Sequence, residues 1–184
     1  MFLGIILGLL KPKKLYQIAR LQRPCLHLKI AKNLGNYVDF SSPIRYWNLF
    51  SQLIKNSNNT YLIKQCRGFQ PDLIILAGYL KKIPIDLINI FKNKIINIHP
   101  SLLPKYGGKG MYGDKVHNQI LLNHEKETGI TIHYVDEKYD RGKIIFQKKI
   151  NLQTEETLNS IKGKIKNLEL RYFPIIIHEL LYGR

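Results

Sequence analysis

The sequence predicts an α/β domain in which helices flank a mostly parallel, twisted sheet. Short β-rich apolar runs alternate with amphipathic stretches along the chain, which is the pattern of successive strand–helix units. The 184 residues suffice for one domain with a full core, and the 45% hydrophobic content excludes an intrinsically disordered chain. We therefore expect a single domain over residues 1–184, without an internal repeat or a linker.

The amino-terminal third predicts two strands and two helices. Residues 1–10 are an apolar run too short to span a bilayer and without the cleavage site of a signal peptide, so we interpret residues 3–9 as a buried strand. Residues 13–22 predict a short helix, and alternating apolar residues over 26–30 predict a half-buried strand. The pair Ser42-Pro43 is typical of a helix start. The apolar face of that helix is Ile44, Trp47, Phe50 and Ile54.

The middle of the chain predicts four further strands. Residues 72–78 form a continuous apolar run that ends in glycine, as expected for a central parallel strand buried on both faces. Residues 95–98 predict a second central strand, residues 130–135 a third with alternating polarity, and residues 144–150 a fourth. A two-turn helix is expected at residues 84–91, between the first two of these strands.

The carboxyl-terminal region predicts a long helix. Thr154 and the two glutamates after it are the expected N-terminal cap. Pro174 is expected to break or kink the helix, residues 175–181 to continue as a last short helix, and Gly183 to stop it. The residues that form one apolar face at helical spacing are Leu158, Ile161, Ile165, Leu168 and Tyr172.

The chain is strongly basic, with 29 Lys and Arg residues against 13 acidic residues and a net charge of +16. Such a balance favours anionic partners, but the lysines are dispersed and form no block of like charge, so nucleic acid is not the expected partner. Cys25 and Cys66 lack metal-ligand spacing, and we interpret both as buried thiols in a reducing cytoplasm.

The stretch around Asn97 and His99 is the strongest candidate site. The two residues are two positions apart at the carboxyl end of a predicted strand, so their side chains project from the same face. Functional groups of open α/β sheets gather at this edge, where an amide and an imidazole can stabilise an oxyanion. The alternative is that His99 caps the strand and Asn97 holds a turn. Asp140 lies in a turn between two apolar strands, and a carboxylate near an imidazole favours the charged ring.

Four segments of the second half resemble a known family. They are Pro71-Asp-Leu-Ile-Ile-Leu-Ala-Gly78-Tyr, Asn97-Ile-His99-Pro-Ser-Leu-Leu-Pro104-Lys-Tyr, Thr128-Gly-Ile-Thr-Ile-His133-Tyr-Val, and Tyr139-Asp140 followed by Gly142. In them the chain resembles the 10-formyltetrahydrofolate-dependent formyltransferases, and most closely the branch that formylates glycinamide ribonucleotide in de novo purine biosynthesis. The resemblance covers residues 70–182 and implies a Rossmann-like formyltransferase fold.

The resemblance also implies roles for individual residues. Asn97 and His99 would stabilise the tetrahedral oxyanion formed when an amine attacks a formyl carbon, and Asp140 would move protons through water. The co-substrate is 10-formyltetrahydrofolate, and no metal is implied. Residues that match the folate-binding segments are Tyr79, Leu80, Lys81, Lys82, Ile83, Tyr139 and Arg141. Residues that match contacts to the ribonucleotide are His117, Lys166 and Glu169.

Three of the matched positions have an equally good structural interpretation. His133 fits core packing as well as support of the site, and His117 is equally open between a structural role and a functional one. Glu169 fits a solvated helical glutamate as well as a ligand of the ribonucleotide. Lys81 stands where the family commonly has an arginine that pairs with the glutamate tail of the folate, and a lysine there keeps the positive charge.

The amino-terminal part departs from the family pattern. Family members begin with a strand, a glycine- and serine-rich loop and a helix whose N-terminus holds the substrate phosphate, and no such loop occurs here. We expect a divergent or truncated part over residues 1–69 and a matching catalytic part over residues 70–182. The sequence is compatible with three classes of protein: an active formyltransferase, an inactive truncated protein of that fold, and a basic RNA- or anion-binding module. Methionyl-tRNA formyltransferases share the His-Pro-Ser-Leu-Leu-Pro string but normally carry an additional carboxyl-terminal domain.

Overall fold

In the part of the chain that the structure describes, six strands form one sheet with the order β1-β2-β3-β4-β5-β6. The computed structural model describes residues 7–9, 14–18, 59–69, 71–77 and 79–183. β2, β3 and β4 are parallel, whereas β1 is antiparallel to β2, β5 to β4 and β6 to β5. The strands are β1 (Leu7–Leu9), β2 (Lys14–Ile18), β3 (Leu73–Ala77), β4 (Ile95–His99), β5 (Glu127–Tyr134) and β6 (Ile144–Asn151).

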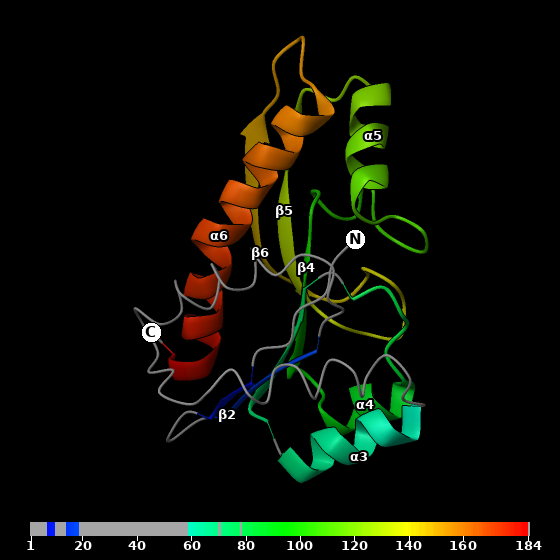
Figure 1. Cartoon of the computed structure of the whole chain (residues 1–184), viewed down its shortest axis with the longest axis vertical. Helices are drawn as coiled ribbons and strands as arrows, with labels where there is room; N and C mark the ends of the chain where they lie inside the picture. Colours follow the sequence, from blue (N-terminus) through cyan, green and yellow to red (C-terminus); the bar gives the residue numbers. More distant parts are fainter. Residues whose placement is uncertain (1–6, 10–13, 19–58, 70, 78, 184) are drawn as a thin grey trace.

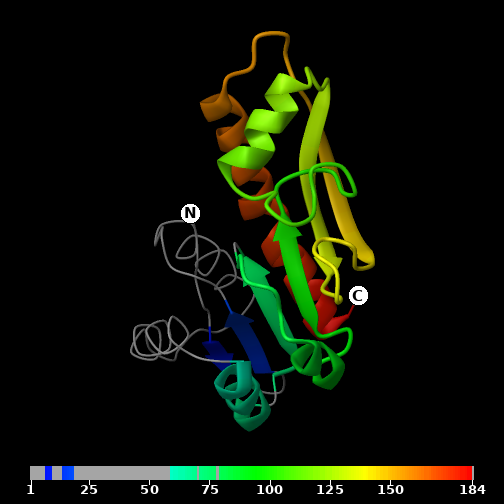
Figure 2. The same ribbon diagram turned by 90° about the vertical axis from the view of Figure 1, so that its right-hand side faces the viewer.

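Helices cover both faces of this sheet (Figure 1, Figure 2). α6 (Leu158–Tyr182) runs along one face, where it packs with α5 (Asp114–Leu122) against β4 and β5. α3 (Asn59–Phe69) and α4 (Ile85–Ile90) lie together on the other face, at the opposite end of the molecule from α5. The described residues therefore form an α/β architecture, as the sequence predicts, with two separate apolar cores.

The two faces of β4 carry different kinds of side chain. Ile96 and Ile98 belong to the core under α5 and α6, and Ile95 belongs to the core under α3 and α4. Because side chains alternate along a strand, Asn97 and His99 share the face of Ile95. Asn97 is half-buried and His99 is buried, so the carboxyl end of this face carries polar groups in place of aliphatic ones.

The structure confirms most of the predicted elements in the second half. β3 is buried on both faces, since Leu73 and Ile75 belong to one core and Ile74 and Leu76 to the other. The strand predicted at residues 95–98 extends to His99, and the one predicted at 130–135 begins at Glu127. The strand at 144–150 and the helix at 84–91 are present as β6 and α4. α3 is an element that the sequence did not reveal.

Three predicted features are wrong. Residues 14–18 are strand β2 and not a helix, because pairing with β1 and β3 outweighs the helical spacing of the apolar residues. The cap of α6 is Thr157, whose side chain accepts a hydrogen bond from the Ser160 amide, and not Thr154. Pro174 does not break α6, which continues to Tyr182, so residues 175–181 are not a separate helix; Gly183 follows it in a left-handed conformation, as predicted.

Some predictions lie outside the described residues. They are the first part of the strand at 3–9, the strand through Leu26, Leu28 and Ile30, the helix that starts at Ser42-Pro43 with Trp47 on its apolar face, and the burial of Cys25. Within the described part, β1 agrees with the end of the predicted first strand, and Cys66 is fully buried as expected.

Candidate active site

The carboxyl end of β4 brings together the residues that the sequence singled out. Asn97 pairs with His133 across the antiparallel ladder between β4 and β5, and His99 pairs with Thr131, so these four side chains share one face. Asp140 comes from the connection between β5 and β6. His99 and His133 are only 4% and 2% exposed, which places both rings inside the protein and not at its rim.

The carboxylate of Asp140 lies between the two imidazole rings. Its Oδ2 atom is 3.6 Å from His99 Nδ1, and its Oδ1 atom is 3.6 Å from His133 Nε2. These distances are within reach of one bridging water, so the predicted convergence of Asn97, His99 and Asp140 is present in the structure. The sequence alone suggested the proximity of Asp140 to His99 but not its position between two rings.

His133 orients the amide of Asn97. The Nδ1 atom of His133 is 2.8 Å from the Tyr134 carbonyl oxygen, which can only accept, so Nδ1 carries the hydrogen. The Nε2 atom faces both the Asn97 amide nitrogen at 3.2 Å and Asp140 Oδ1 at 3.6 Å. It accepts from the amide when the ring is neutral and can donate to the carboxylate when the ring is charged. Of the two interpretations of His133, the structure favours support of the site, because this buried ring fixes the direction in which the Asn97 amide points.

His99 is held by the main chain of the loop that follows β4. Its Nε2 atom lies 2.7 Å from the carbonyl oxygen of Tyr106 and therefore carries a hydrogen that it donates. The Nδ1 atom faces Asp140. Burial lowers the pKa of His99, while the carboxylate of Asp140 and the Tyr106 carbonyl partly oppose this by favouring the charged ring.

Asp140 is fixed by the same loop. The backbone amide of Gly108 donates to its Oδ2 atom at 2.9 Å. Burial alone would raise the pKa of Asp140, but the rings of His133 and His99 and the Gly108 amide outweigh it and hold the pKa below its usual value. Asp140 also has a φ of 54°, an uncommon conformation for a residue other than glycine. The carboxylate of Asp140 is thus ionised and lies between the Gly108 amide and the rings of His99 and His133.

Close approach of the two loops depends on glycine. A Cβ atom on Gly107 would lie 2.4 Å from a methyl carbon of Leu103 and 3.2 Å from the Cβ of Asp140. A Cβ atom on Gly142 would lie 1.8 Å from the Tyr134 carbonyl oxygen, which leaves no room for any side chain. Gly107 thus lets the 105–110 loop approach Asp140, and Gly142 lets the β5–β6 connection pack against the end of β5.

A buried polar group below the site holds the chain just after His99. Thr131 donates to the Ser101 carbonyl at 2.7 Å and accepts from the Leu103 amide at 3.0 Å. Gln147 on β6 donates to both the Thr131 hydroxyl and the Leu103 carbonyl, each at 2.9 Å. The sequence gives no signal for the hydrogen bonds of Thr131 and Gln147, because both residues are far from the Asn97–His99 segment in sequence and meet only across the β5–β6 ladder.

The residues predicted to bind folate lie on two segments that approach each other. Tyr79, Leu80, Lys81, Lys82 and Ile83 follow β3, while Tyr139 and Arg141 flank Asp140. Ile83 is buried, Tyr79 and Leu80 are half-buried, and both lysines are exposed. Tyr139 is half-buried and Arg141 is exposed.

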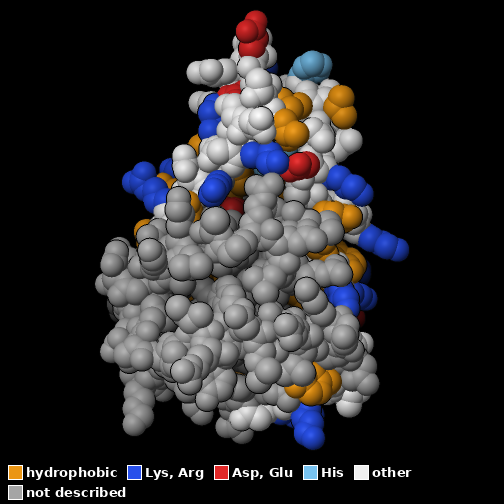
Figure 3. Space-filling model, viewed as in Figure 1, with side chains coloured by type: hydrophobic (Ala, Val, Ile, Leu, Met, Phe, Trp, Pro, Cys, Tyr) orange, Lys and Arg blue, Asp and Glu red, His pale blue; other side chains and the backbone are white. Residues whose placement is uncertain are grey.

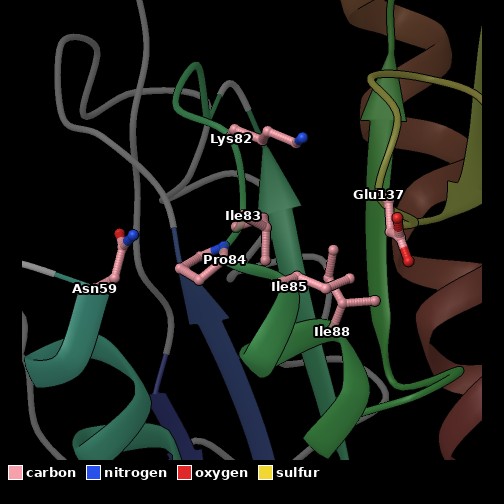
Figure 4. Close-up of a pocket in the computed structure, with 7 residues that line it drawn as sticks. All are labelled: Asn59, Lys82, Ile83, Pro84, Ile85, Ile88 and Glu137. Atoms are coloured by element: carbon pink, nitrogen blue, oxygen red, sulfur yellow. The ribbon is translucent and has the colours of Figure 1, made fainter.

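A pocket of about 200 Å³ lies beside α4 between these segments (Figure 4). Lys82 and Ile83 border it from the first segment, and Glu137 borders it from the β5–β6 connection. The other lining residues are Asn59, Pro84, Ile85 and Ile88. The pocket thus combines an apolar floor with a cationic and an anionic group at its border.

The predicted ribonucleotide residues are more dispersed. His117 on α5 is 5% exposed, and its Nδ1 atom is buried without a hydrogen-bond partner among the described residues. Burial lowers the pKa of His117 to about 4; the charge of Asp114 opposes this, while Lys162 and His99 lower the pKa slightly further. Lys166 and Glu169 lie on α6, and burial raises the pKa of Glu169 to about 7. Among the described residues, no hydrogen bond or ion pair joins Lys166 or Glu169 to the trio.

Basic side chains are spread over the visible surface. Figure 3 shows lysine and arginine side chains scattered around the described part of this face, without a continuous basic patch. Within the described ranges, no group of three or more His, Cys, Asp or Glu side chains is arranged to hold a metal ion. No helix in the described part of the chain is long and apolar enough to cross a bilayer.

Similar proteins were found at the level of family, sequence and structure. Phosphoribosylglycinamide formyltransferase of Bacillus subtilis is 42% identical over 120 residues, which cover 65% of this chain and 59% of that protein. The chloroplastic phosphoribosylglycinamide formyltransferase of Vigna unguiculata is 41% identical over 123 residues, which cover 67% of this chain and 39% of that protein. The chain thus spans less than two thirds of the length of these curated relatives.

Solved structures of proteins with the same name are also similar to this chain. The crystal structure of phosphoribosylglycinamide formyltransferase from Bacillus halodurans has a TM-score of 0.61 at 36% identity, covering 67% of this chain and 61% of that one. The enzyme of the same name from Coxiella burnetii has a TM-score of 0.62 at 32% identity. The model of the formyl transferase family matches residues 29–177, a range that includes β3, β4, β5, β6 and every predicted site residue. This chain therefore belongs to the formyl transferase family.

Proposed function

We propose that this chain transfers the formyl group of 10-formyltetrahydrofolate to the amine of glycinamide ribonucleotide, a step of de novo purine biosynthesis. The observation that carries the proposal is the convergence of Asn97, His99 and Asp140 in a member of the formyl transferase family. The relatives from Bacillus subtilis and Vigna unguiculata, which align with about two thirds of the chain, are named for this reaction.

The first chemical step needs donors for a developing oxyanion. When the amine nitrogen attacks the formyl carbon, a new C–N bond forms and the electron pair of the C=O double bond moves to oxygen. We assign this oxyanion to the second N–H of the Asn97 amide, since the first is engaged by His133. The Nδ1 atom of His99 can add a second donor only when the ring is charged, a form that burial opposes and the neighbouring Asp140 carboxylate favours. Each such donor is worth about 2.7–4 kcal/mol in the transition state.

The second requirement is the movement of one proton. The attacking amine must lose a proton, and the folate nitrogen must gain one as its bond to the formyl carbon breaks. Asp140 suits this role because its pKa lies below the usual value, so the carboxylate is ionised and can accept a proton through a bridging water. The products are a formamide and tetrahydrofolate, and atoms and charge balance without a further reactant.

The pocket beside α4 suits part of the folate co-substrate. Ile83, Ile85 and Ile88 supply an apolar surface for a ring, and Glu137 supplies a carboxylate that can accept hydrogen bonds from an amino-substituted heterocycle. Lys81, which is exposed on the same segment, supplies a positive charge for the glutamate tail. Of the residues that we assign to the folate, Lys82 and Ile83 border this pocket; the assignment of Tyr79, Leu80, Tyr139 and Arg141 rests on the resemblance of their segments to the family.

The ribonucleotide is assigned to His117, Lys166 and Glu169 on α5 and α6. Glu169 has a pKa of about 7, so its carboxylate is about half ionised at neutral pH and can accept hydrogen bonds from ribose hydroxyls. Lys166 supplies positive charge for a phosphate. We place the reaction in the cytoplasm, and the buried thiol of Cys66 suits such a reducing compartment.

The direct test is an acceptor assay with the purified chain. We expect 10-formyltetrahydrofolate to be converted to tetrahydrofolate when glycinamide ribonucleotide is present, with much slower conversion when water or methionyl-tRNA is the only acceptor. A His99→Ala variant serves as the matched inactive protein. Conversion that is independent of the acceptor, or equal in the variant, would contradict the proposal.

The inactive-protein alternative is distinguished in the same samples. Calorimetric titration with tetrahydrofolate should give binding to both the wild-type chain and the His99→Ala variant. Folate binding without any turnover in the wild-type chain would favour an inactive protein of this fold, and the absence of both would refute the site assignment as a whole.

A further inference from the structure

The loop after β4 touches both His99 and Asp140, and one cluster ties this loop to the rest of the fold. The Tyr106 carbonyl accepts from His99, and the Gly108 amide donates to Asp140. Residues 106–108 therefore set the positions of two groups of the proposed site. Tyr106 itself has a φ of 55°, an uncommon left-handed conformation, so an additional contact is needed to hold it in place.

That contact is made by what we call the anchor cluster, which consists of Lys105, Tyr106, Asn123 and Glu125. The Tyr106 hydroxyl donates to Glu125 Oε1 at 2.8 Å and accepts from the Asn123 amide at 2.8 Å. Lys105 donates to the same Glu125 oxygen at 3.0 Å. The side chain of Tyr106 thus engages the anchor cluster while its main chain engages His99.

Backbone hydrogen bonds hold the turn that carries Glu125 in place. It lies in the turn between α5 and β5, and its own amide donates to the Ile120 carbonyl at 3.1 Å. The next residue, Lys126, accepts from Leu152 at 2.8 Å, which ties the turn to the chain after β6. The hydrogen bonds from Tyr106 and Lys105 lower the pKa of Glu125, so the group is an ionised, strong acceptor.

We infer that Tyr106 and Glu125 are positioning residues for the proposed formyl transfer: they hold the Tyr106 carbonyl against His99 Nε2 and thereby keep Nδ1 of that ring directed at Asp140. Neither side chain needs to touch a substrate in this arrangement. The inference rests on the proposed function only for its effect on catalysis, because the ring orientation and tautomer of His99 are properties of the protein without substrate.

The test compares three variants with two matched controls. Tyr106→Phe removes only the hydroxyl, Glu125→Ala removes the acceptor, and Glu125→Gln keeps an oxygen that accepts from Tyr106. Glu127→Ala is the control for Glu125, since Glu127 is two residues away and forms an ion pair with exposed Lys149 at 3.1 Å. Its charge also acts on Lys105, but less than Glu125 does, and among the described residues no hydrogen bond joins it to Tyr106. Tyr112→Phe is the control for loss of a tyrosine hydroxyl from the neighbouring loop.

The first readout is the tautomer of His99, measured by ¹⁵N NMR of the imidazole ring at a pH where the ring is neutral. The wild-type chain and both controls should show hydrogen on Nε2. In Tyr106→Phe and Glu125→Ala we expect the population with hydrogen on Nδ1 to rise about tenfold, since one hydrogen bond to a charged group is lost. Glu125→Gln should remain close to wild type. An unchanged tautomer in the first two variants overturns the inference.

The second readout is steady-state formyl transfer. Tyr106→Phe and Glu125→Ala should lower kcat about tenfold with KM within about twofold of wild type, and the double variant should be no worse than either single one. A loss of thermal stability with unchanged kcat would show a merely structural cluster and would overturn the inference. If the wild-type chain transfers no formyl group, the proposed function fails, while the NMR result still decides this inference.

Discussion

The two faces of β4 differ in kind although their residues alternate in one short strand. On the face toward α5 and α6, Ile96 and Ile98 pack into a core with Phe173 and neighbouring aliphatic side chains. On the other face, Asn97 and His99 follow Ile95 and meet His133 and Asp140. One face of β4 therefore stabilises the fold and the other carries the proposed catalytic groups. We expect substitutions on one face to affect stability and substitutions on the other face to affect activity.

The largest effect is expected on the core face. Phe173 on α6 is fully buried, and Phe173→Ala should lower the free energy of unfolding by about 3–5 kcal/mol because it removes transfer energy and leaves a cavity. Urea unfolding followed by circular dichroism measures the change. The remaining folded protein should bind tetrahydrofolate normally; an affinity that falls in proportion to stability loss would mean that the two faces are not separable.

The next effect is expected on the site face. Asp140→Asn should lower kcat by about a hundredfold or more, corresponding to about 2.7–4 kcal/mol, because the amide cannot accept the proton of the amine. Its stability should change far less than that of Phe173→Ala. The assay is formyl transfer at saturating substrates, with the folded fraction determined in the same sample. A variant that keeps most of its activity would remove Asp140 from the mechanism.

A pH effect of similar size is expected from His117, a buried residue of α5. The pKa of His117 is about 4 in the folded chain against 6.5 for an ordinary histidine. The unfolded chain therefore binds a proton that the folded chain does not bind, and the His117 contribution to stability should be lost as the pH decreases from about 6.5 to about 4, by on the order of 3 kcal/mol. Glu169, whose pKa burial raises to about 7, contributes with the opposite sign over this range, so the effect of His117 is measured as a difference between the wild-type chain and a His117 variant.

Unfolding titrations at a series of pH values measure this slope. The stability of His117→Gln should fall less than that of the wild-type chain as the pH decreases over that range. The pH dependence that both proteins share comes from other groups, among them His99, whose pKa burial lowers, and Glu169, whose pKa burial raises. Parallel curves for the two proteins would show that His117 does not stay neutral in the folded chain.

The smallest effect concerns α6, the helix that covers the core face. Thr157 accepts from the Ser160 amide at 3.1 Å, so Thr157→Ala should cost about 1 kcal/mol of stability. Thr154→Ala is the matched control and should change stability by less than about 0.5 kcal/mol. Thermal unfolding distinguishes the two; a larger effect at Thr154 would mean that the helix starts where the sequence pattern suggested.

The strands around the site could be predicted because their patterns are unambiguous. The continuous apolar run of β3 and the Asn-x-His pair at the end of β4 follow directly from burial and strand periodicity. The helix expected at residues 13–22 is wrong because the spacing of Leu15 and Ile18 fits a helix and a short strand equally well, and pairing with β1 and with the distant strand β3 determines the outcome. Local sequence contains no information about those partners.

The site was predictable only in its principal groups. Asn97, His99 and Asp140 could be singled out because their chemistry and motifs are distinctive. The contacts of Tyr106 and Gly108 use main-chain atoms, which any residue type can supply, so the sequence does not reveal them. The partnership of Thr131 with Gln147 depends on the register between β5 and β6, which is likewise set by tertiary packing.

The most direct test of the account compares two adjacent residues on opposite faces of β4. Asn97→Ala and Ile98→Ala are assayed for formyl transfer per folded molecule and for free energy of unfolding. We predict that Asn97→Ala loses about a hundredfold or more in kcat with a stability change below about 1.5 kcal/mol, and that Ile98→Ala loses about 2–5 kcal/mol of stability while the folded molecules keep their kcat. Full activity in Asn97→Ala, or equal losses of activity in both variants, would contradict the assignment of this face to the chemistry.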